Sequence, residues 1–142
     1  MAALADRTGP TLFQLPPQLG CDLDRLQNFL DLLPEGRQTI EFRHPSWYVD
    51  PVFEMLRRHD VALCVSDHHD APSPWVRTAS FAYVRGHGPT GHYEGSYADS
   101  ELDGWADHVS AWKASGDVYA YFDNDIGCAA PDDAFRLRQR MG

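Results

Sequence analysis

Short strand-like runs of apolar residues alternate with stretches of helical periodicity along most of this chain. The pattern predicts five strands, at residues 11–15, 39–43, 62–67, 81–87 and 118–124. It also predicts four helices, from Asp22 to about residue 35, from Asp50 onward, from about residue 100 to 115, and from Pro131 to the end. Asp22 and the Asp50–Pro51 pair are typical helix starts, because Asp caps free N–H groups and Pro fits the first turn.

Strand-helix alternation of this kind favours a parallel sheet built of right-handed crossover units. In a doubly wound sheet, helices cover both faces and the strands are almost entirely apolar. Here polar side chains share one face of three strands: Glu41 and Arg43, then Tyr83, Arg85 and His87, then Tyr119, Tyr121 and Asp123. An inner face that opens into a site is typical of a barrel. We therefore predict an α/β fold of the TIM-type (β/α) barrel, here a partial barrel of about five strands and four helices.

Length and composition predict one soluble domain. The chain has 142 residues, 43% of them hydrophobic, and no apolar run approaches the roughly 20 residues that span a membrane. Residues 1–10 lack the pattern of a signal peptide, and Cys21, Cys64 and Cys128 form no close pair. We expect a cytoplasmic protein without a membrane partner. The net charge of −9 argues against general attraction to nucleic acid, although a local basic pocket is compatible with it.

Five segments carry a resemblance to a known family. They are LFQLPP at 12–17, EFRHPSW at 41–47, YVRGHG at 83–88, YAYFDND at 119–125 and AAP at 129–131. These segments resemble the YecE-like family, known as domain of unknown function 72, whose members are single (β/α)₈-type barrels of roughly 250 residues. The resemblance implies that residues 11–142 are the C-terminal portion of such a barrel, without about three N-terminal strands. Residues 1–10 would then be the tail of a preceding helix and its linker.

Two interpretations of the shortened barrel stay open at this stage. The chain is either a truncated or mis-started gene product, or a partial barrel that another chain completes. In both cases open strand edges and apolar surface are exposed, so we expect self-association through the barrel edges or poor stability.

The carboxyl ends of barrel strands hold the active sites of this fold. Polar residues fall there on each predicted strand: Gln14, Glu41, Arg43, Asp67, Arg85, His87 and Asp123. We predict Glu41 or Asp123 as general base, His87 as proton donor or shuttle, and the two arginines as the groups that neutralise developing charge. The expected substrate-binding set is completed by residues next to these strand ends: His44, Tyr121 and Asn124. A structural ion pair is the alternative for Glu41 and Arg43.

The ligand class follows from the last two strands, which the resemblance makes the seventh and eighth of a complete barrel. Loops after those strands often bind phosphate, and Arg85, His87 and the glycines at 86, 88 and 91 offer suitable donors. We therefore expect a small anionic ligand, such as a phosphorylated one. The similarity of the fold to metal-dependent barrel nucleases and sugar isomerases suggests a hydrolase of phosphoester type, by analogy alone. The alternatives are a non-catalytic barrel that binds a nucleotide, a sugar or a nucleic-acid end, and an inactive fragment.

The sequence leaves the cofactor open. Glu41, Asp67, His87 and Asp123 are ligand types for a divalent metal, and His68 and His69 add two imidazoles on the predicted loop. The chain contains neither an HxxxH nor an HExxH spacing. We accordingly assign no residue as a metal ligand, and a divalent metal stays one option for the cofactor.

Overall fold

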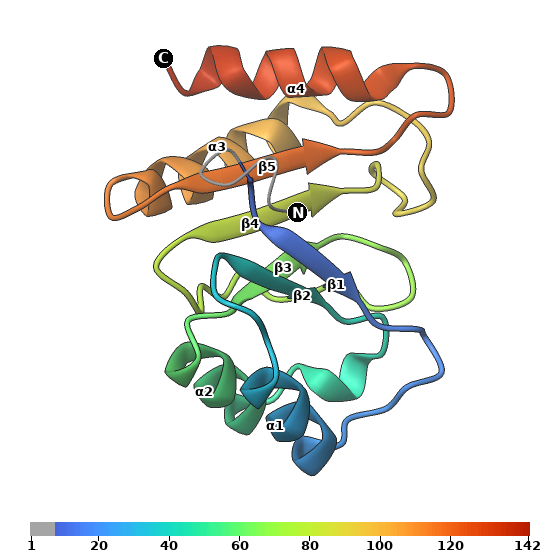
Figure 1. Ribbon diagram of the computed structural model, residues 1–142. Helices are drawn as coiled ribbons and strands as arrows, with labels where there is room; N and C mark the ends of the chain where they lie inside the picture. Colours follow the sequence, from blue (N-terminus) through green and yellow to red (C-terminus); the bar gives the residue numbers. More distant parts are fainter. Residues whose placement is uncertain (1–7) are drawn as a thin grey trace.

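Five parallel strands form one curved sheet in the computed structural model, which describes residues 8–142. The strands are β1 (Thr11–Gln14), β2 (Gln38–Glu41), β3 (Ala62–Ser66), β4 (Ala82–Gly86) and β5 (Val118–Phe122). Their order in the sheet is their order in the chain, β1-β2-β3-β4-β5. Each strand therefore pairs with the one before it, as in one half of a parallel barrel (Figure 1).

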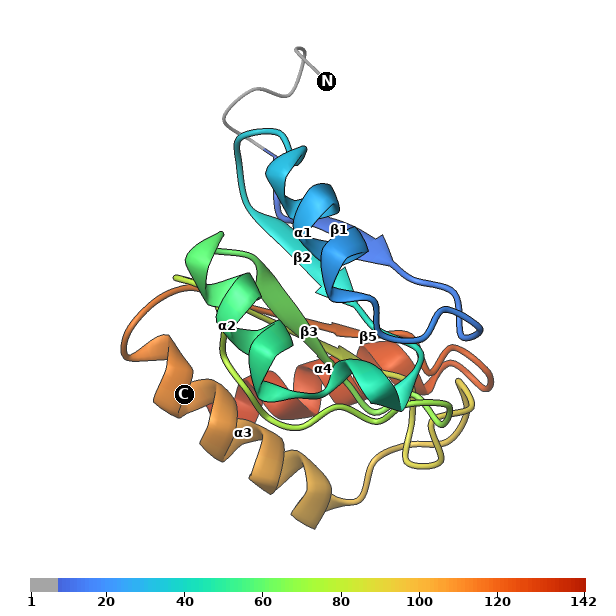
Figure 2. The same cartoon turned by 90° about the horizontal axis from the view of Figure 1, so that it is seen from below.

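Four α-helices lie along the outer side of this sheet (Figures 1 and 2). They are α1 (Leu23–Asp31), α2 (Asp50–Arg58), α3 (Asp99–Lys113) and α4 (Ala129–Arg140), and a short 3₁₀ helix, η2 (Pro45–Trp47), precedes α2. No helix within residues 8–142 combines the length and the apolar character needed to cross a membrane. The arrangement confirms the predicted α/β half-barrel.

Strand alternation separates an apolar outer face from a mixed inner face. Ile40, Phe42 and Leu63 point outward and pack with the buried faces of α1 and α2. Val65 and Val84 also point outward, into a second cluster with α3 and α4. The inner face holds a smaller third cluster, formed by Ala62, Cys64, Phe81 and Tyr83 with Leu12, Ala79 and Tyr119 around it. The polar ends of the strands lie beyond this small core.

Element boundaries differ from the prediction by a few residues. Helix α1 ends at Asp31 rather than near residue 35, because Pro34 disfavours a helical conformation at the residue before it. Helix α4 begins at Ala129, before Pro131, whose missing N–H costs nothing in the first turn of a helix. The expected tail at residues 1–10 lies outside the described residues except for 8–10, which form neither helix nor strand.

The two outer strands are less well covered than the central ones. Every residue of β2 and β3 is buried, whereas no residue of β5 is. An open groove of about 1380 Å³ follows β5 between the ends of α3 and α4, and Phe122, Leu137 and Met141 are among the residues that line it. Phe135 in α4, 58% exposed, lies at the same groove. The described part of the chain thus leaves apolar surface open along β5.

Candidate functional site

A buried carboxylate joins two arginines at the carboxyl end of the sheet. Glu41 is the last residue of β2 and points inward, with 0% of its surface exposed. Its Oε1 forms an ion pair with Arg43 Nη2 at 2.8 Å, and its Oε2 accepts from Arg85 Nη1 at 2.8 Å. Arg85 Nη2 also donates to Asp123 Oδ2 at 2.7 Å. We call these four residues, together with Gln14, Asp67 and His87, the charged network.

His87 is completely buried at the centre of the charged network. Its backbone N–H donates to Asp67 Oδ1 at 2.6 Å, and its Nδ1 lies 3.3 Å from the same oxygen. Its Nε2 lies 3.2 Å from Arg43 Nη2, which is always a donor. A ring proton on Nδ1 fits these partners, because Asp67 then accepts a hydrogen bond and Nε2 receives one from Arg43.

Gln14 connects the first strand to both arginines. Its Oε1 accepts from Arg43 Nη2 at 3.1 Å and from Arg85 Nη1 at 3.2 Å. The seven residues that the sequence predicted at the strand ends are therefore all brought together. Asp67 reaches the charged network although it shares parity with the outward-facing Val65, because β3 ends at Ser66 and alternation no longer applies beyond it.

Three residues of the site were missed by the sequence analysis. Ser66 Oγ donates to Glu41 Oε1 at 3.2 Å, and its parity with Ala62 and Cys64 was the available signal. Tyr93 accepts from Arg43 Nη1 at 3.3 Å. Tyr97 donates from its hydroxyl to Asp67 Oδ2 and accepts the Gly88 N–H at 2.8 Å. The two tyrosines lie between β4 and α3, where no periodic pattern predicts which way a side chain points.

Burial shifts the proton affinity of several groups at the site. It raises the pKa of Asp123 above the usual range, against the opposing effects of His87 and Arg85. Burial, with the neighbouring Asp67 carboxylate, also raises the pKa of Tyr97, which keeps that hydroxyl a donor. Asp123 therefore holds its proton to a higher pH than an ordinary Asp.

Two predicted substrate ligands lie at the edge of this arrangement. His44 Nδ1 accepts from the Ser46 N–H at 3.2 Å and caps η2, so the side chain is occupied outside the charged network. Tyr121 stands beside Arg85 in the strand register and stacks on Tyr83, with ring centroids 5.1 Å apart. Tyr121 is 46% exposed on the inner face. A role for either residue in substrate binding stays a prediction.

Asn124 has a positioning role in the structure. Its side-chain amide donates to the Gly95 carbonyl at 2.7 Å and to Asp133 Oδ2 at 2.8 Å. Asp133, completely buried in α4, also accepts from the Tyr97 N–H at 3.1 Å. Asn124 thus ties the end of β5 to α4 and to the loop that carries Tyr97. Its role as a substrate ligand stays a prediction.

The charged network holds more acidic than basic side chains. Glu41, Asp67 and Asp123 face two arginines, and the terminal nitrogens of both arginines already have partners. Arg43 Nε and Asp123 Oδ1 are buried without a hydrogen-bond partner among the described residues. An incoming anion would have to share the arginines with these carboxylates, which favours a ligand that also carries donors.

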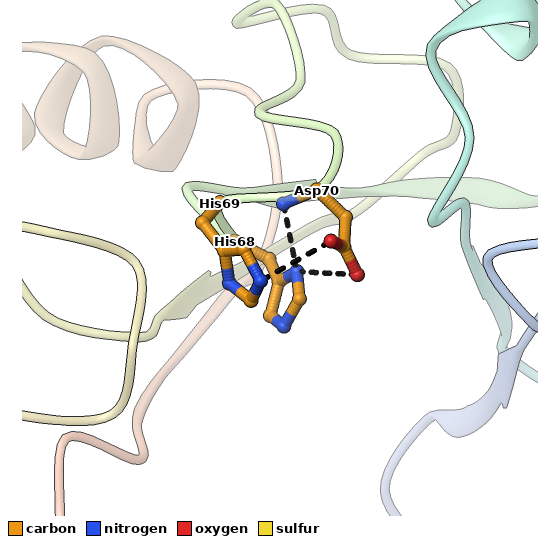
Figure 3. A group of neighbouring side chains, drawn as sticks. All are labelled: His68, His69 and Asp70. Atoms are coloured by element: carbon orange, nitrogen blue, oxygen red, sulfur yellow. Dashed lines mark hydrogen bonds and ion pairs between the residues drawn. The ribbon is translucent and has the colours of Figure 1, made fainter.

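A possible metal-binding group lies beside the charged network instead of within it. In the described part of the chain, the side chains near enough to one another to hold an ion are those of His68, His69 and Asp70 (Figure 3). Glu41, Asp67, His87 and Asp123, which the sequence offered as ligand types, are not in such a group. The His68 ring contacts the His87 ring edge to face, with centroids 5.0 Å apart. Two arrays of ionisable groups therefore meet at this end of the sheet.

Parallel strands in chain order, outer helices and a polar network at the carboxyl ends of the strands define a protein of the (β/α)-barrel class. The comparison with protein families agrees: the family described as "Protein of unknown function DUF72" matches residues 1–142. The chain belongs to the DUF72 family.

Solved structures of the family share the fold. A DUF72 family protein from Thermotoga maritima matches with a TM-score of 0.87 and 23% identity, over 97% of this chain and 59% of that one. A DUF72 family protein from Enterococcus faecalis V583 matches with a TM-score of 0.87 and 17% identity, over 99% of this chain and 61% of that one. The chain thus spans about three fifths of the length of these proteins. A search of the curated proteins found no match.

Proposed function

We propose that the charged network is an acid/base site for hydrolysis of an anionic substrate of the phosphoester class. The observation that carries the proposal is the environment of buried His87. Its Nδ1 faces Asp67, and its Nε2 lies 3.6 Å from Asp123 Oδ2 and 3.2 Å from Arg43. A carboxylate that orients an imidazole, with a second carboxyl group at the other ring nitrogen, is an arrangement that can move protons.

Asp123 is better suited than Glu41 to exchange a proton with substrate. Both oxygens of Glu41 are bound, and its side chain is 0% exposed. The Asp123 side chain is 20% exposed, its pKa is raised by burial, and its Oδ1 has no partner among the described residues. In the proposal Asp123 is the acid/base, His87 relays the proton, and Glu41 holds the two arginines in place.

The test uses a chromogenic phosphomonoester and a chromogenic phosphodiester as probes. Asp123→Asn and His87→Gln should each lower turnover by about 10²–10⁴-fold, the usual contribution of a positioned acid or base. Asp117→Asn is the matched control, because Asp117 is an Asp that pairs with an arginine at the opposite end of the strands. Cleavage that survives in Asp123→Asn, or the absence of cleavage by the parent chain, would contradict the proposal.

A binding function without turnover is the second proposal, and the tyrosine pair favours it. Tyr121 and Tyr83 present a stacked surface beside Arg85 on the inner face, suited to a base or a sugar ring. Tyr121→Ala should then weaken the binding of a nucleotide or sugar probe, while Asp123→Asn leaves it intact. If the charged network is catalytic, replacement of Glu41 abolishes turnover; if it only binds, the same change lowers affinity alone.

Self-association through the open barrel edges is the proposed quaternary behaviour of this chain. The half-exposed strand β5, the groove beside it and the 58% exposed Phe135 support it. Light scattering coupled to size exclusion should show a mass above that of one chain, and the mass should rise with concentration. A sharp monomer peak at every concentration, with cooperative melting, would contradict this proposal.

A cytoplasmic location is proposed on the basis of the cysteines. Cys21, Cys64 and Cys128 are all free thiols in the structure, as a reducing compartment favours. Cell fractionation should recover the protein with cytoplasmic markers, and recovery with an oxidising compartment would contradict this location.

A further inference from the structure

Three consecutive side chains on the loop after β3 converge on one point (Figure 3). His69 Nε2 lies 3.1 Å from Asp70 Oδ1, and His68 Nδ1 lies 3.6 Å from Asp70 Oδ2. Ligand atoms about 2.0–2.2 Å from one tetrahedral ion stand roughly 3.3 Å apart, so the two observed spacings lie on either side of that value. All three donor atoms lie within 4.8 Å of one another.

The tautomer of His69 is set by a backbone carbonyl. Its Nδ1 lies 3.0 Å from the Gly91 oxygen, which can only accept, so Nδ1 carries the proton. In the neutral ring the lone pair of Nε2 then faces an oxygen of Asp70 only 3.1 Å away. Two acceptors at this distance repel each other unless a proton or a metal ion lies between them.

The loop that holds this carbonyl is fixed closely against the histidines. Gly91 has a φ of +72°, and a Cβ at this position would stand 2.5 Å from the His69 nitrogen and 2.6 Å from the Asp67 oxygen. The contact between His69 Nδ1 and the Gly91 carbonyl is therefore held in place by close packing. Metal-binding histidines commonly have this kind of carbonyl partner on the other ring nitrogen.

His68 supplies the second imidazole from a buried position. Its side chain is 5% exposed. Its Nδ1 accepts a hydrogen bond from the Asp70 N–H at 3.2 Å, which a metal ion would replace.

We propose that His68, His69 and Asp70 bind a divalent transition-metal ion of the zinc type. Two imidazoles and one carboxylate are the ligand set that zinc accepts with a coordination position left open, and the 36% and 38% exposed side chains of His69 and Asp70 leave access from solvent. The exposed His92 ring stacks on His69 with centroids 3.9 Å apart and planes 16° apart. In that position His92 covers the site. It is not a ligand, because an imidazole binds a metal in the plane of its own ring.

The position of the site bears on the proposed function. Because the His68 and His87 rings touch, an ion here would add positive charge beside a network whose arginines are already paired. That role rests on the hydrolase proposal, whereas metal binding itself does not. The two can fail separately, since binding is measured without substrate.

The test is titration of the tag-free, chelator-stripped chain with Co²⁺, followed by its visible spectrum, and with Zn²⁺ by calorimetry. We expect one ion per chain and a spectrum with nitrogen and oxygen ligands. His69→Ala and Asp70→Asn should each weaken binding at least tenfold, since loss of even an outer partner costs about 10–100-fold. A thiolate charge-transfer band would instead assign the ion to exposed Cys128 and overturn the proposal.

His59 provides a matched control within the same chain. Its Nδ1 lies 2.9 Å from the Met55 carbonyl and its Nε2 lies 3.1 Å from Asp31 Oδ1, but this pair lacks a second imidazole. His59→Ala should leave Co²⁺ binding unchanged, and circular dichroism should show that each variant is folded. No stoichiometric binding, or equal loss in His59→Ala and His69→Ala, would overturn the proposal.

Discussion

The half-barrel carries an arginine–carboxylate cluster at each end of its strands, and the two clusters differ in burial. At the carboxyl end, the side chains of Arg43 and Glu41 are 4% and 0% exposed. At the amino end, Arg37 pairs with Asp117 at 2.7 Å, and these side chains are 44% and 63% exposed. The chemistry of the two pairs is the same, and only one of them is shielded from water.

The exposed ion pair of Arg37 needs no special explanation, whereas the buried ion pair of Glu41 does. The Arg37 guanidinium lies 5.6 Å from the Tyr119 ring centroid and joins the bases of β2 and β5, and an exposed pair of this kind costs little to form. The buried pair had to lose its hydration, which ion pairing seldom repays with a surplus. A fold gains little stability from such a network, so we attribute its presence at the strand ends to function.

Removal of the central carboxylate should be the most damaging change. Glu41→Ala leaves Arg43 and Arg85 without their shared partner, and loss of one member of a buried ion pair costs about 3–5 kcal/mol. Urea denaturation should show this decrease in the free energy of unfolding. A decrease below about 1 kcal/mol would mean that water reaches the charged network and that the contrast with Arg37 is false.

A substitution in the loop that closes over the carboxyl end of the strands should have the next largest effect on stability. Gly91→Ala places a Cβ 2.5 Å from the His69 nitrogen at a φ of +72°. We expect a loss of about 1–3 kcal/mol, the usual cost of a strained backbone position. Gly127→Ala is a control of similar conformation, with a φ of +81° but open space around the added Cβ. Equal losses in the two variants would show that close packing at Gly91 adds nothing.

The pH dependence of stability tests the environment of Asp123. Its raised pKa means that the unfolded chain loses this proton first as the pH rises, so ionisation of Asp123 disfavours the folded state above its folded pKa and has no effect below the unfolded value. Asp123→Asn removes this titration. Relative to the parent, the variant should therefore gain stability as the pH rises from the unfolded value of about 4 to the folded pKa, and the difference should be constant above it. A difference that stays constant throughout would mean that the pKa is not shifted, and one that falls with rising pH would mean that Arg85 lowers it.

A substitution in the exposed cluster at the amino end of the strands should have the smallest effect on stability. Arg37→Ala removes one surface ion pair, a hydrogen bond to the Tyr119 hydroxyl and two cation–π contacts. We expect a loss of about 0–1 kcal/mol, reduced further by salt. The same denaturation series, repeated at high ionic strength, measures it. A loss as large as that of Glu41→Ala would show that the amino end, too, depends on a desolvated pair.

The periodicity of the chain predicted the sheet and the position of the charged network because both follow from alternation. Glu41 and Arg85 point inward by parity with Thr39 and Tyr83, and parallel strands bring their ends together. Beyond the end of a strand, side chains no longer alternate between the two faces. This is why Asp67 reaches the charged network despite its parity with Val65, and why His44, two residues from Phe42, turns away to cap η2.

Loop conformation accounts for the rest of what the sequence could not predict. Tyr93 and Tyr97 reach the site from a segment whose path depends on glycines with positive φ, such as Gly88 and Gly91. Asn124 looked like a strand-end ligand, but buried Asp133 of α4 competes for its amide. Contacts between distant segments decide these side chains, and one sequence contains no local pattern for them.

The order of the strands has a consequence for the way the chain is made. Each strand pairs with the strand that left the ribosome just before it, so every ladder can form during synthesis without waiting for later residues. Arg37 is the exception at the amino end, because its partners Asp117 and Tyr119 belong to the last strand segment. The bond across the interior therefore waits for the last strand of an otherwise sequential sheet. A nascent chain stalled before residue 117 would hold four paired strands and an arginine still in water.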